Sequence, residues 1–372
     1  MWKGVDSVTF EPAWQAILLD GLPHDEAEPA VEAILERFAE LPSWPQLPRR
    51  SPLENMYALY AEGFPGLRED AGVSFVEHGA ILERELGELH LAYLDNDVEY
   101  GRISASHAMG LDALLRRLAG SKPKAIKGEI TGPVSWSLTM LDEQRRPILY
   151  DRVLEGATAQ HLRLKAAWQE RVLRRVAGET IIILNEPYMA SFGSSFVPFS
   201  RERAISLFSE VLAGIQGIGG VHCCGATDWS VILDTSARLI SWDAYDYMAS
   251  LLAYAEPLAA FVERGGILCW GMVPAGMPAR WESPESLADR IEQGLDALAA
   301  AGIDRERAVG QSMVSPSCGL GGLDIELAEL ILNLTRDLAR TMQQRYPPQS
   351  QTEQDERSAD DPSATALEGD VV

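Results

Sequence analysis

The feature that most constrains the fold is a repeat that begins near Lys124. Short apolar or β-branched runs that end in Gly, Pro or Asn alternate with longer stretches of helical periodicity. Strands this apolar are buried on both faces, which is typical of a parallel sheet whose strands are connected by helices. Six such strands are predicted: AIKGEITG (125–132), TIIILNE (180–186), GGVHCCG (219–225), ARLISWDAY (237–245), GGILCWGMVP (265–274) and AVGQSMVSPSCG (308–319).

Two amphipathic stretches between these strands are predicted to be helices, at 157–178 and 283–302. The second has a clear start. Ser283 is a suitable N-cap, Pro284 fits the first helical position, and Glu285 places a negative charge in the first turn, where the helix dipole favours it.

With six βα units visible and space upstream for two more, we expect a single (β/α)₈ TIM barrel over residues 1–346. The first 120 residues are harder to interpret, because the stretch 41–66 is rich in Pro and aromatic residues. We expect them to include an irregular segment that covers one end of the barrel. The tail, 347–372, is acidic and rich in Pro, Ser and Gln, so we expect it to be disordered.

The net charge of the chain argues against some classes of binding partner. The chain has 32 basic and 55 acidic residues and a formal net charge of −23. Such a surface repels phosphate backbones and anionic lipids, so we expect neither a nucleic acid nor a membrane as partner. With four cysteines, no leader-like N-terminus and no long apolar run, we expect a reducing, cytoplasmic location.

The stretch HCCG contains a candidate metal site. Residues i and i+2 of a strand point to the same side, so His222 and Cys224 face one way and Cys223 the other. Cys318 follows the last predicted strand and should reach the same end of the barrel. One His and two Cys form a three-ligand zinc site with an open position, as in catalytic zinc centres.

The alternative is that these cysteines only fill space, since free Cys is among the most buried residue types. We prefer that interpretation for Cys223 and Cys269. For His222, Cys224 and Cys318 we prefer the metal site, because all three lie where barrel enzymes build their active sites.

Four motifs in this order resemble the catalytic barrel of cobalamin-independent methionine synthase and the related methylcobalamin:thiol methyltransferases. That superfamily also includes uroporphyrinogen decarboxylase. The motifs are EITGPVSWS (129–137), LNEPY (184–188), HCCG (222–225) and SPSCGLGG (315–322), with GLPH (21–24) as a looser match. The resemblance covers roughly residues 125 to 325. It implies that His222, Cys224 and Cys318 bind Zn²⁺.

The chain departs from this family at two site positions. Where the methionine synthases have an Asp that helps to hold the amino group of homocysteine, this chain has Asn185, which carries no charge. The family's fourth zinc ligand is a Glu on the next strand. The alignment places Asp243 there, with Asp246 as a rival.

Other residues are candidates for the substrate pocket. Glu186 could orient a substrate ammonium or cap a helix, and Asp228 could act at the mouth or cap the helix after it. Trp229 could line the mouth. Glu54 is a candidate for binding the substrate amino group by weak similarity to the synthases, and His24 is either a pocket donor or a solvated loop residue.

The resemblance implies a zinc-dependent methyltransferase that moves a methyl group to a small thiol, with homocysteine as the leading acceptor and methionine as product. The family's full-length synthases use a second, N-terminal barrel to help bind folate, and this chain has no space for one. We therefore expect methylcobalamin or a methylated corrinoid protein as donor. The alternatives are a decarboxylase of the uroporphyrinogen type, a methylcobalamin:coenzyme M-type methyltransferase and a non-catalytic zinc- or corrinoid-binding protein.

Overall fold

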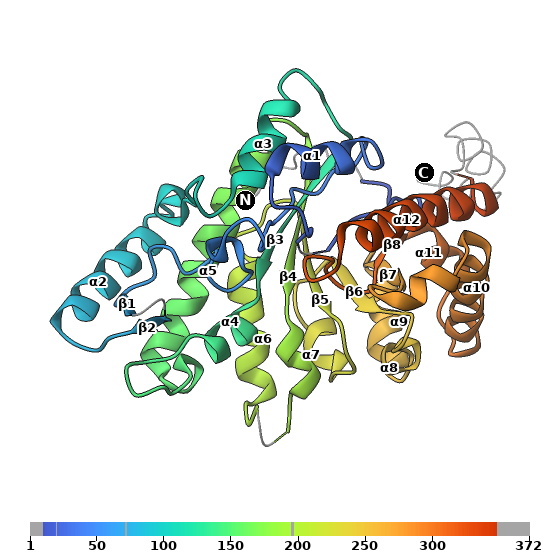
Figure 1. The fold of residues 1–372 in the computed structure, drawn as a ribbon. Helices are drawn as coiled ribbons and strands as arrows, with labels where there is room; N and C mark the ends of the chain where they lie inside the picture. The colour runs from blue at the N-terminus through green and yellow to red at the C-terminus, as the bar shows by residue number, and fades with distance from the viewer. Residues whose placement is uncertain (1–9, 20, 71–72, 195–196, 348–372) are drawn as a thin grey trace, which may run out of the picture.

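A computed structural model describes residues 10–347 except 20, 71–72 and 195–196 (Figure 1). Most of the predicted acidic tail, from residue 348 onward, therefore lies outside the described residues. Among the described residues, no helix is both long and apolar enough to cross a lipid bilayer.

A curled, six-stranded parallel sheet forms the centre of the molecule, with strand order β3-β4-β5-β6-β7-β8. The strands are β3 (Ala125–Thr131), β4 (Glu179–Asn185), β5 (Ile218–Cys223), β6 (Leu239–Asp243), β7 (Ile267–Val273) and β8 (Ser312–Pro316). Each observed strand lies inside a predicted strand or extends at most one residue beyond it, so all six strand predictions are confirmed. Every residue of five of these strands is buried, as expected for a parallel sheet that is covered on both faces.

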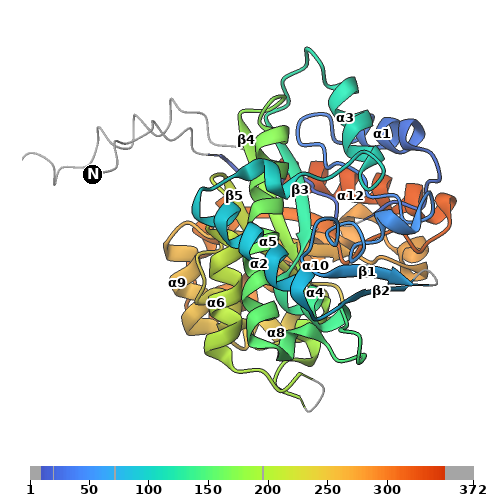
Figure 2. The same ribbon diagram turned by 90° about the vertical axis from the view of Figure 1, so that its left-hand side faces the viewer.

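Helices cover the convex face of the sheet (Figures 1 and 2). They are α4 (Pro133–Thr139), α5 (Arg152–Leu173), α6 (Arg201–Leu212), α7 (Trp229–Leu233), α8 (Met248–Leu252), α9 (Ala255–Glu263), α10 (Pro284–Ala300), α11 (Arg305–Gly310) and α12 (Ile325–Arg345). Both predicted helices, α5 and α10, are present. The predicted start of α10 is confirmed: the Ser283 side chain accepts from the backbone N–H of Ser286, with Pro284 at the first helical position.

The six-stranded sheet agrees with a TIM-like barrel, but two of the eight predicted strands are not regular. Instead, two N-terminal segments contact the sheet edges through single parallel bridges, Ala16 to Val314 on β8 and Ser43 to Lys127 on β3. The second segment contains several prolines, including Pro42 and Pro45, which cannot donate to a strand ladder. The two segments also contact each other, since the Leu18 N–H donates to the Ser43 hydroxyl at 3.3 Å.

The first 120 residues contain more regular structure than their sequence indicates. They form α1 (Ala27–Leu35), an antiparallel hairpin of β1 (Leu67–Asp70) and β2 (Val73–Val76), α2 (Ala80–Leu94) and α3 (Met109–Arg117). The stretch 41–66, which was predicted to be irregular, contains only the short 3₁₀ turn η1 (Pro52–Glu54). Other 3₁₀ turns are η2 (Val98–Gly101), η3 (Ile148–Tyr150), η4 (Pro187–Ser191) and η5 (Met277–Trp281).

Alternating residues of the strands belong to two separate apolar clusters. Ile182, Val221 and Cys223 pack in the large cluster that includes the covering helices. Ile181, Ile183 and their neighbours form a smaller cluster of strand and N-terminal residues that contains no helix residue, so it fills the concave side of the sheet. This inner cluster ends below the carboxyl ends of the strands, where the inward side chains become polar.

Candidate metal centre

The inward position near the end of β5 holds His222, whose side chain is nearly fully buried. Its Nδ1 lies 2.9 Å from the hydroxyl of Ser241 on the neighbouring strand, which fixes the orientation of the ring. Nε2 is buried and has no hydrogen-bond partner among the described residues. A buried polar atom without a partner is unfavourable, and a ligand or metal would satisfy it.

The structure brings Cys224 and Cys318 together with His222. Cys224 follows β5 directly, Cys318 lies two residues beyond β8, and both side chains are half-buried. Interaction with the Cys224 thiol and burial raise the pKa of Cys318 to about 12, and the nearby imidazole of His222 opposes this shift. The three residues proposed from their spacing are therefore neighbours at the carboxyl ends of the strands. Their role as ligands stays a prediction.

Asp243, at the end of β6, is the carboxylate nearest to this group. It is mostly buried, and its charge is close enough to interact with His222. One oxygen accepts the Asp246 backbone N–H at 2.9 Å, and burial raises the Asp243 pKa above its usual value. The rival Asp246 is exposed to solvent. Asp243 is thus the better placed of the two, although its ligation is a prediction.

The donor set suits zinc, but the geometry is not preformed. Imidazole nitrogen and thiolate sulfur are preferred zinc ligands, and the Cys318 thiol lies beside both the His222 imidazole and the Cys224 thiol. Within the described ranges, however, no three His, Cys, Asp or Glu side chains stand in positions that could hold a metal ion. The residues fit the metal in type and proximity, and side-chain rotation would be needed to complete the site.

The other two cysteines are fully buried in the apolar clusters, as expected for packing residues. Cys223 belongs to the helix-side core, where burial raises its thiol pKa to about 12. Cys269 lies in the inner cluster, and burial raises its pKa to about 11. Both thiols are therefore protonated at neutral pH.

Glu186 holds the start of α4 in place. It is fully buried, and its two oxygens accept the backbone N–H groups of Val134 at 3.0 Å and Ser135 at 2.8 Å. Burial raises its pKa to about 7, and the hydrogen bonds with Ser135 and Val134 oppose the shift. A Cβ on residue 132 would lie 2.2 Å from this carboxylate, so the glycine of the EITGPVSWS motif leaves space for the Glu186 side chain. The capping alternative is thus present in the structure, and a catalytic role for Glu186 stays a prediction.

Asn185 contacts a buried ion pair that the sequence analysis missed. Its Nδ2 donates to Oε2 of Glu129 at 3.2 Å, and Glu129 forms a salt bridge with Lys127. All three side chains are at most 2% exposed and lie on the inner side of the sheet, next to the strand of His222. The sequence signal was available: a charged residue at alternating positions of the otherwise apolar run AIKGEIT.

Glu54 and His24 have partners in the N-terminal region. Glu54 is fully buried, pairs with Arg50 and accepts the Leu47 N–H at 3.1 Å, and burial raises its pKa. His24 is buried, and its burial lowers its pKa, while Glu329 on α12 opposes the shift. Neither side chain has a described contact with His222, Cys224 or Cys318, so their substrate roles are predictions only.

Asp228 and Trp229 lie at the start of α7. The Asp228 carboxylate accepts from the Ser230 backbone N–H at 3.1 Å, so it caps this short helix. Trp229 is fully buried in the helix-side core, and its Nε1 donates to the Ser250 hydroxyl at 3.2 Å. The structure therefore gives Asp228 a capping position and places Trp229 in the core.

No protein-family model and no curated protein matches this sequence. Solved structures do share its fold. A protein from Listeria monocytogenes, provisionally named a vitamin-B12 independent methionine synthase, is 12% identical and has a TM-score of 0.53 over 87% of this chain and 86% of its own. A methyltransferase from Methanosarcina mazei is 14% identical, with a TM-score of 0.48 over 90% of this chain and 95% of its own.

A B12-independent methionine synthase from Shewanella sp. W3-18-1 is 16% identical, with a TM-score of 0.45. The match covers 64% of this chain and 66% of the length of the Shewanella protein. Identities this low concern the fold and not the chemistry. The chain therefore shares its α/β fold, built on a curled six-stranded parallel sheet, with the Listeria protein.

Proposed function

We propose that this chain is a cytoplasmic, zinc-dependent methyltransferase that methylates a small thiol, with homocysteine as the leading acceptor and methionine as product. The observation that supports the proposal is the group formed by His222, Cys224 and Cys318 at the carboxyl ends of the strands, where the Cys318 thiol lies beside both the Cys224 thiol and the His222 imidazole. We also propose that the segments at Ala16 and Ser43 act as the two remaining strands of the barrel.

The acceptor must react as a thiolate, because the thiolate is the nucleophilic form. A free thiol with a pKa near 8.5 is mostly protonated at neutral pH, so the site has to favour the deprotonated form. Bound zinc would supply the positive charge that keeps a coordinated substrate sulfur deprotonated. The chain's own residues position this chemistry. Ser241 fixes the orientation of the His222 ring through Nδ1, and Asp243 adds negative charge beside the imidazole.

The buried pair of Lys127 and Glu129 defines the charge of the pocket next to Asn185. The pair is neutral overall, and Asn185 adds a hydrogen bond without a charge. An ammonium group on the acceptor would therefore meet polar atoms with no net negative charge. Recognition of an amino-acid thiol at this position rests on hydrogen bonds and is weaker than recognition by a free carboxylate.

The variant Asn185→Asp tests the acceptor. A carboxylate at 185 beside Glu129 leaves two acids for one Lys127, so the pocket gains one net negative charge that an ammonium would neutralise. We expect the apparent KM for homocysteine to fall several-fold. Initial rates measured over a range of homocysteine concentrations check this.

A thiol without an amino group, such as 3-mercaptopropanol, is the control and should respond little to Asn185→Asp. If the substitution instead abolishes turnover with homocysteine while the control thiol is still methylated, Asn185 is matched to a different acceptor.

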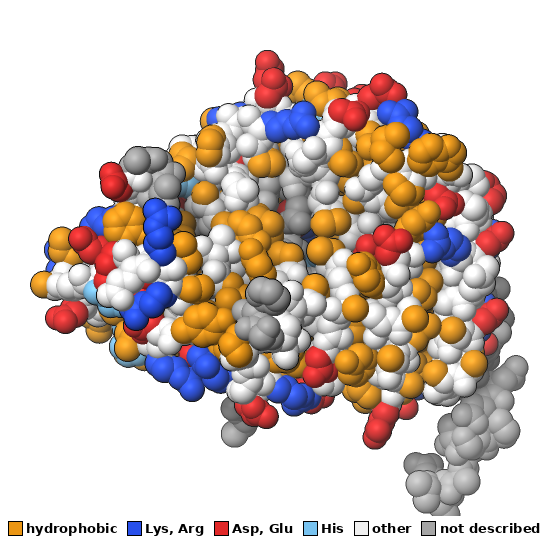
Figure 3. Space-filling model, turned by 60° about the horizontal axis from the view of Figure 1, so that its bottom comes forward, with side chains coloured by type: hydrophobic (Ala, Val, Ile, Leu, Met, Phe, Trp, Pro, Cys, Tyr) orange, Lys and Arg blue, Asp and Glu red, His pale blue; other side chains and the backbone are white. Residues whose placement is uncertain are grey.

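The proposed donor is methylcobalamin, carried by a separate corrinoid protein. Exposed hydrophobic side chains lie on loops that follow the strands: Tyr188 after β4, Tyr247 after β6, and Met277 and Trp281 after β7. Trp281 is 75% exposed, and the loop before it is held to the Cys318 region by a hydrogen bond from the Ala275 N–H to Ser317. Figure 3, which brings the lower side of Figure 1 forward, shows hydrophobic side chains around a central hollow. Such a rim suits the docking of a partner protein that carries the donor.

The donor experiment compares free methylcobalamin with methyltetrahydrofolate. In stopped-flow spectra of the zinc-loaded protein, we expect methylcobalamin to convert to cobalt(I) in step with thioether formation. The variant Trp281→Ser should raise the KM for methylcobalamin about 2–10-fold, which corresponds to the free energy lost with one aromatic contact. Leu91→Ser, which replaces another exposed hydrophobic residue, on α2, is the control and should have no effect.

Turnover with methyltetrahydrofolate and none with methylcobalamin would contradict the donor proposal and leave the thiol methyltransferase proposal standing. Absence of methyl transfer from both donors to every thiol tested would contradict the proposed function itself.

A further inference from the structure

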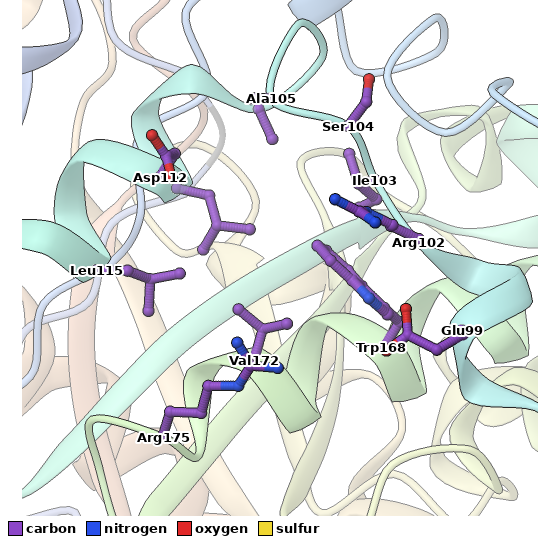
Figure 4. Close-up of a pocket in the computed structure, with 12 residues that line it drawn as sticks. Glu99, Arg102, Ile103, Ser104, Ala105, Asp112, Leu115, Trp168, Val172 and Arg175 are labelled. Atoms are coloured by element: carbon purple, nitrogen blue, oxygen red, sulfur yellow. The ribbon is translucent and has the colours of Figure 1, made fainter.

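A pocket of about 350 Å³ lies between η2, α3 and α5 and shares no lining residue with the candidate metal centre (Figure 4). Its surface is largely apolar. Ile103 from the loop after η2, Leu111 and Leu115 from α3, and Trp168 and Val172 from α5 provide most of this surface. The spacing explains the arrangement, because residues four apart on a helix lie on the same face.

Two arginines, Arg102 and Arg175, also line this pocket. Figure 4 shows both side chains at its wall, one from the loop after η2 and the other from the end of α5. In the part of the chain that the structure describes, neither guanidinium has a hydrogen bond or an ion pair. Most described arginines of this acidic chain do have an acidic partner.

The acids of the pocket do not neutralise these arginines. Glu99 forms its salt bridge with Arg171, and Asp112 forms its salt bridge with Arg116. Neither of these partner arginines lines the pocket. The guanidinium groups of Arg102 and Arg175 therefore have no acidic partner among the described residues and can pair with an incoming anion.

The wall that carries Arg102 is fixed in place. The buried Lys165 donates to the Arg102 backbone carbonyl at 3.0 Å, and Glu62 accepts the Ser104 N–H at 2.8 Å. Gly101 lies so close to α5 that a Cβ there would be 2.1 Å from the Leu164 carbonyl oxygen. A pocket whose backbone is already ordered loses little entropy when it binds a ligand.

We propose that this pocket binds a small organic anion: a carboxylate or phosphate group held by Arg102 and Arg175, with an aromatic or aliphatic body against Trp168 and Val172. Planar guanidinium groups form paired hydrogen bonds with both kinds of anion. An apolar surface with a few converging polar groups is the usual form of a small-molecule site. This site is additional to the methyl-transfer site and does not depend on it.

The probe is 1-anilinonaphthalene-8-sulfonate, an aromatic anion whose fluorescence increases in apolar surroundings. It is titrated into the full chain at low salt, and phenyl phosphate and phenylacetate are then tested as displacers. Saturable binding that either competitor reverses is expected, and the stronger competitor identifies the preferred anion. The double variant Arg102→Met/Arg175→Met should bind the probe at least about tenfold more weakly, because two charge-assisted contacts are lost.

Two further variants separate this pocket from other surfaces. Arg117→Met removes another exposed arginine of α3 that does not line the pocket, and it should bind the probe as the unmodified chain does. Leu115→Trp narrows the pocket while keeping both arginines, and it should also weaken binding. Binding that survives either the double arginine change or Leu115→Trp would overturn the proposal, as would no saturable binding up to about 1 mM probe.

Discussion

Replacing Cys318 by serine is expected to remove the bound zinc and all methyl transfer while the fold is retained. The purified chain should hold about one zinc ion, because one His and two Cys form a single catalytic-type site. A serine hydroxyl does not ionise near neutral pH and cannot replace a thiolate ligand. Cys318 is half-exposed and belongs to neither apolar cluster, so the thermal unfolding midpoint of the metal-free protein should change little.

The matched controls are Cys223→Ser and Cys269→Ser. Neither thiol belongs to the proposed ligand set, so both variants should keep their metal even where stability falls. Cys269 contacts Ser241, which orients His222, so Cys223→Ser is the stricter control. Zinc content is measured by elemental analysis of the purified proteins, and activity with methylcobalamin and homocysteine is measured in parallel. Full zinc occupancy in Cys318→Ser would show that the ligand assignment is wrong.

Strand positions and the grouping of His222 with Cys224 and Cys318 could be predicted because local rules determine them. Apolar runs locate buried strands, and the alternation of side chains along a strand separates Cys224 from Cys223. Parallel strands place their carboxyl ends at one edge of the sheet, so Cys318 falls near the other two residues although 94 positions separate it from Cys224.

What could not be predicted depends on contacts between distant segments. The pairing of Ala16 and Ser43 with the sheet edges involves short segments, and prolines adjoin Ser43, so neither segment has the pattern of a regular strand in the sequence. The contact of Glu186 with the start of α4 joins residues about 50 positions apart, and no local signal distinguishes such a cap from a pocket acid.

The ion pair of Lys127 and Glu129 shows a different limit. Charges at alternating positions of a strand normally indicate that one face meets solvent, yet both side chains here are buried on the inner side of the curled sheet. The pair is stable there because each charge neutralises the other and Glu129 also accepts from Asn185. A pattern that was ambiguous in the sequence is thus a buried polar cluster beside the strand of His222.

Breaking this pair is expected to cost more stability than any other single substitution considered for this chain. Lys127→Met removes the positive charge and leaves the Glu129 carboxylate buried without its ionic partner. Breaking a buried pair in this way typically lowers the free energy of unfolding by about 3–5 kcal/mol. Denaturant unfolding, followed by tryptophan fluorescence at neutral pH, measures this loss.

The double variant Lys127→Met/Glu129→Gln separates the charge from the packing. It removes both charges, keeps a side chain of similar volume at each position, and leaves an amide carbonyl that can still accept from Asn185. Replacing a whole buried pair is often nearly neutral, so the double variant should regain more than half of the stability that Lys127→Met loses. If the free energy of unfolding of Lys127→Met is within about 1 kcal/mol of that of the unmodified chain, water reaches the ion pair in spite of its burial.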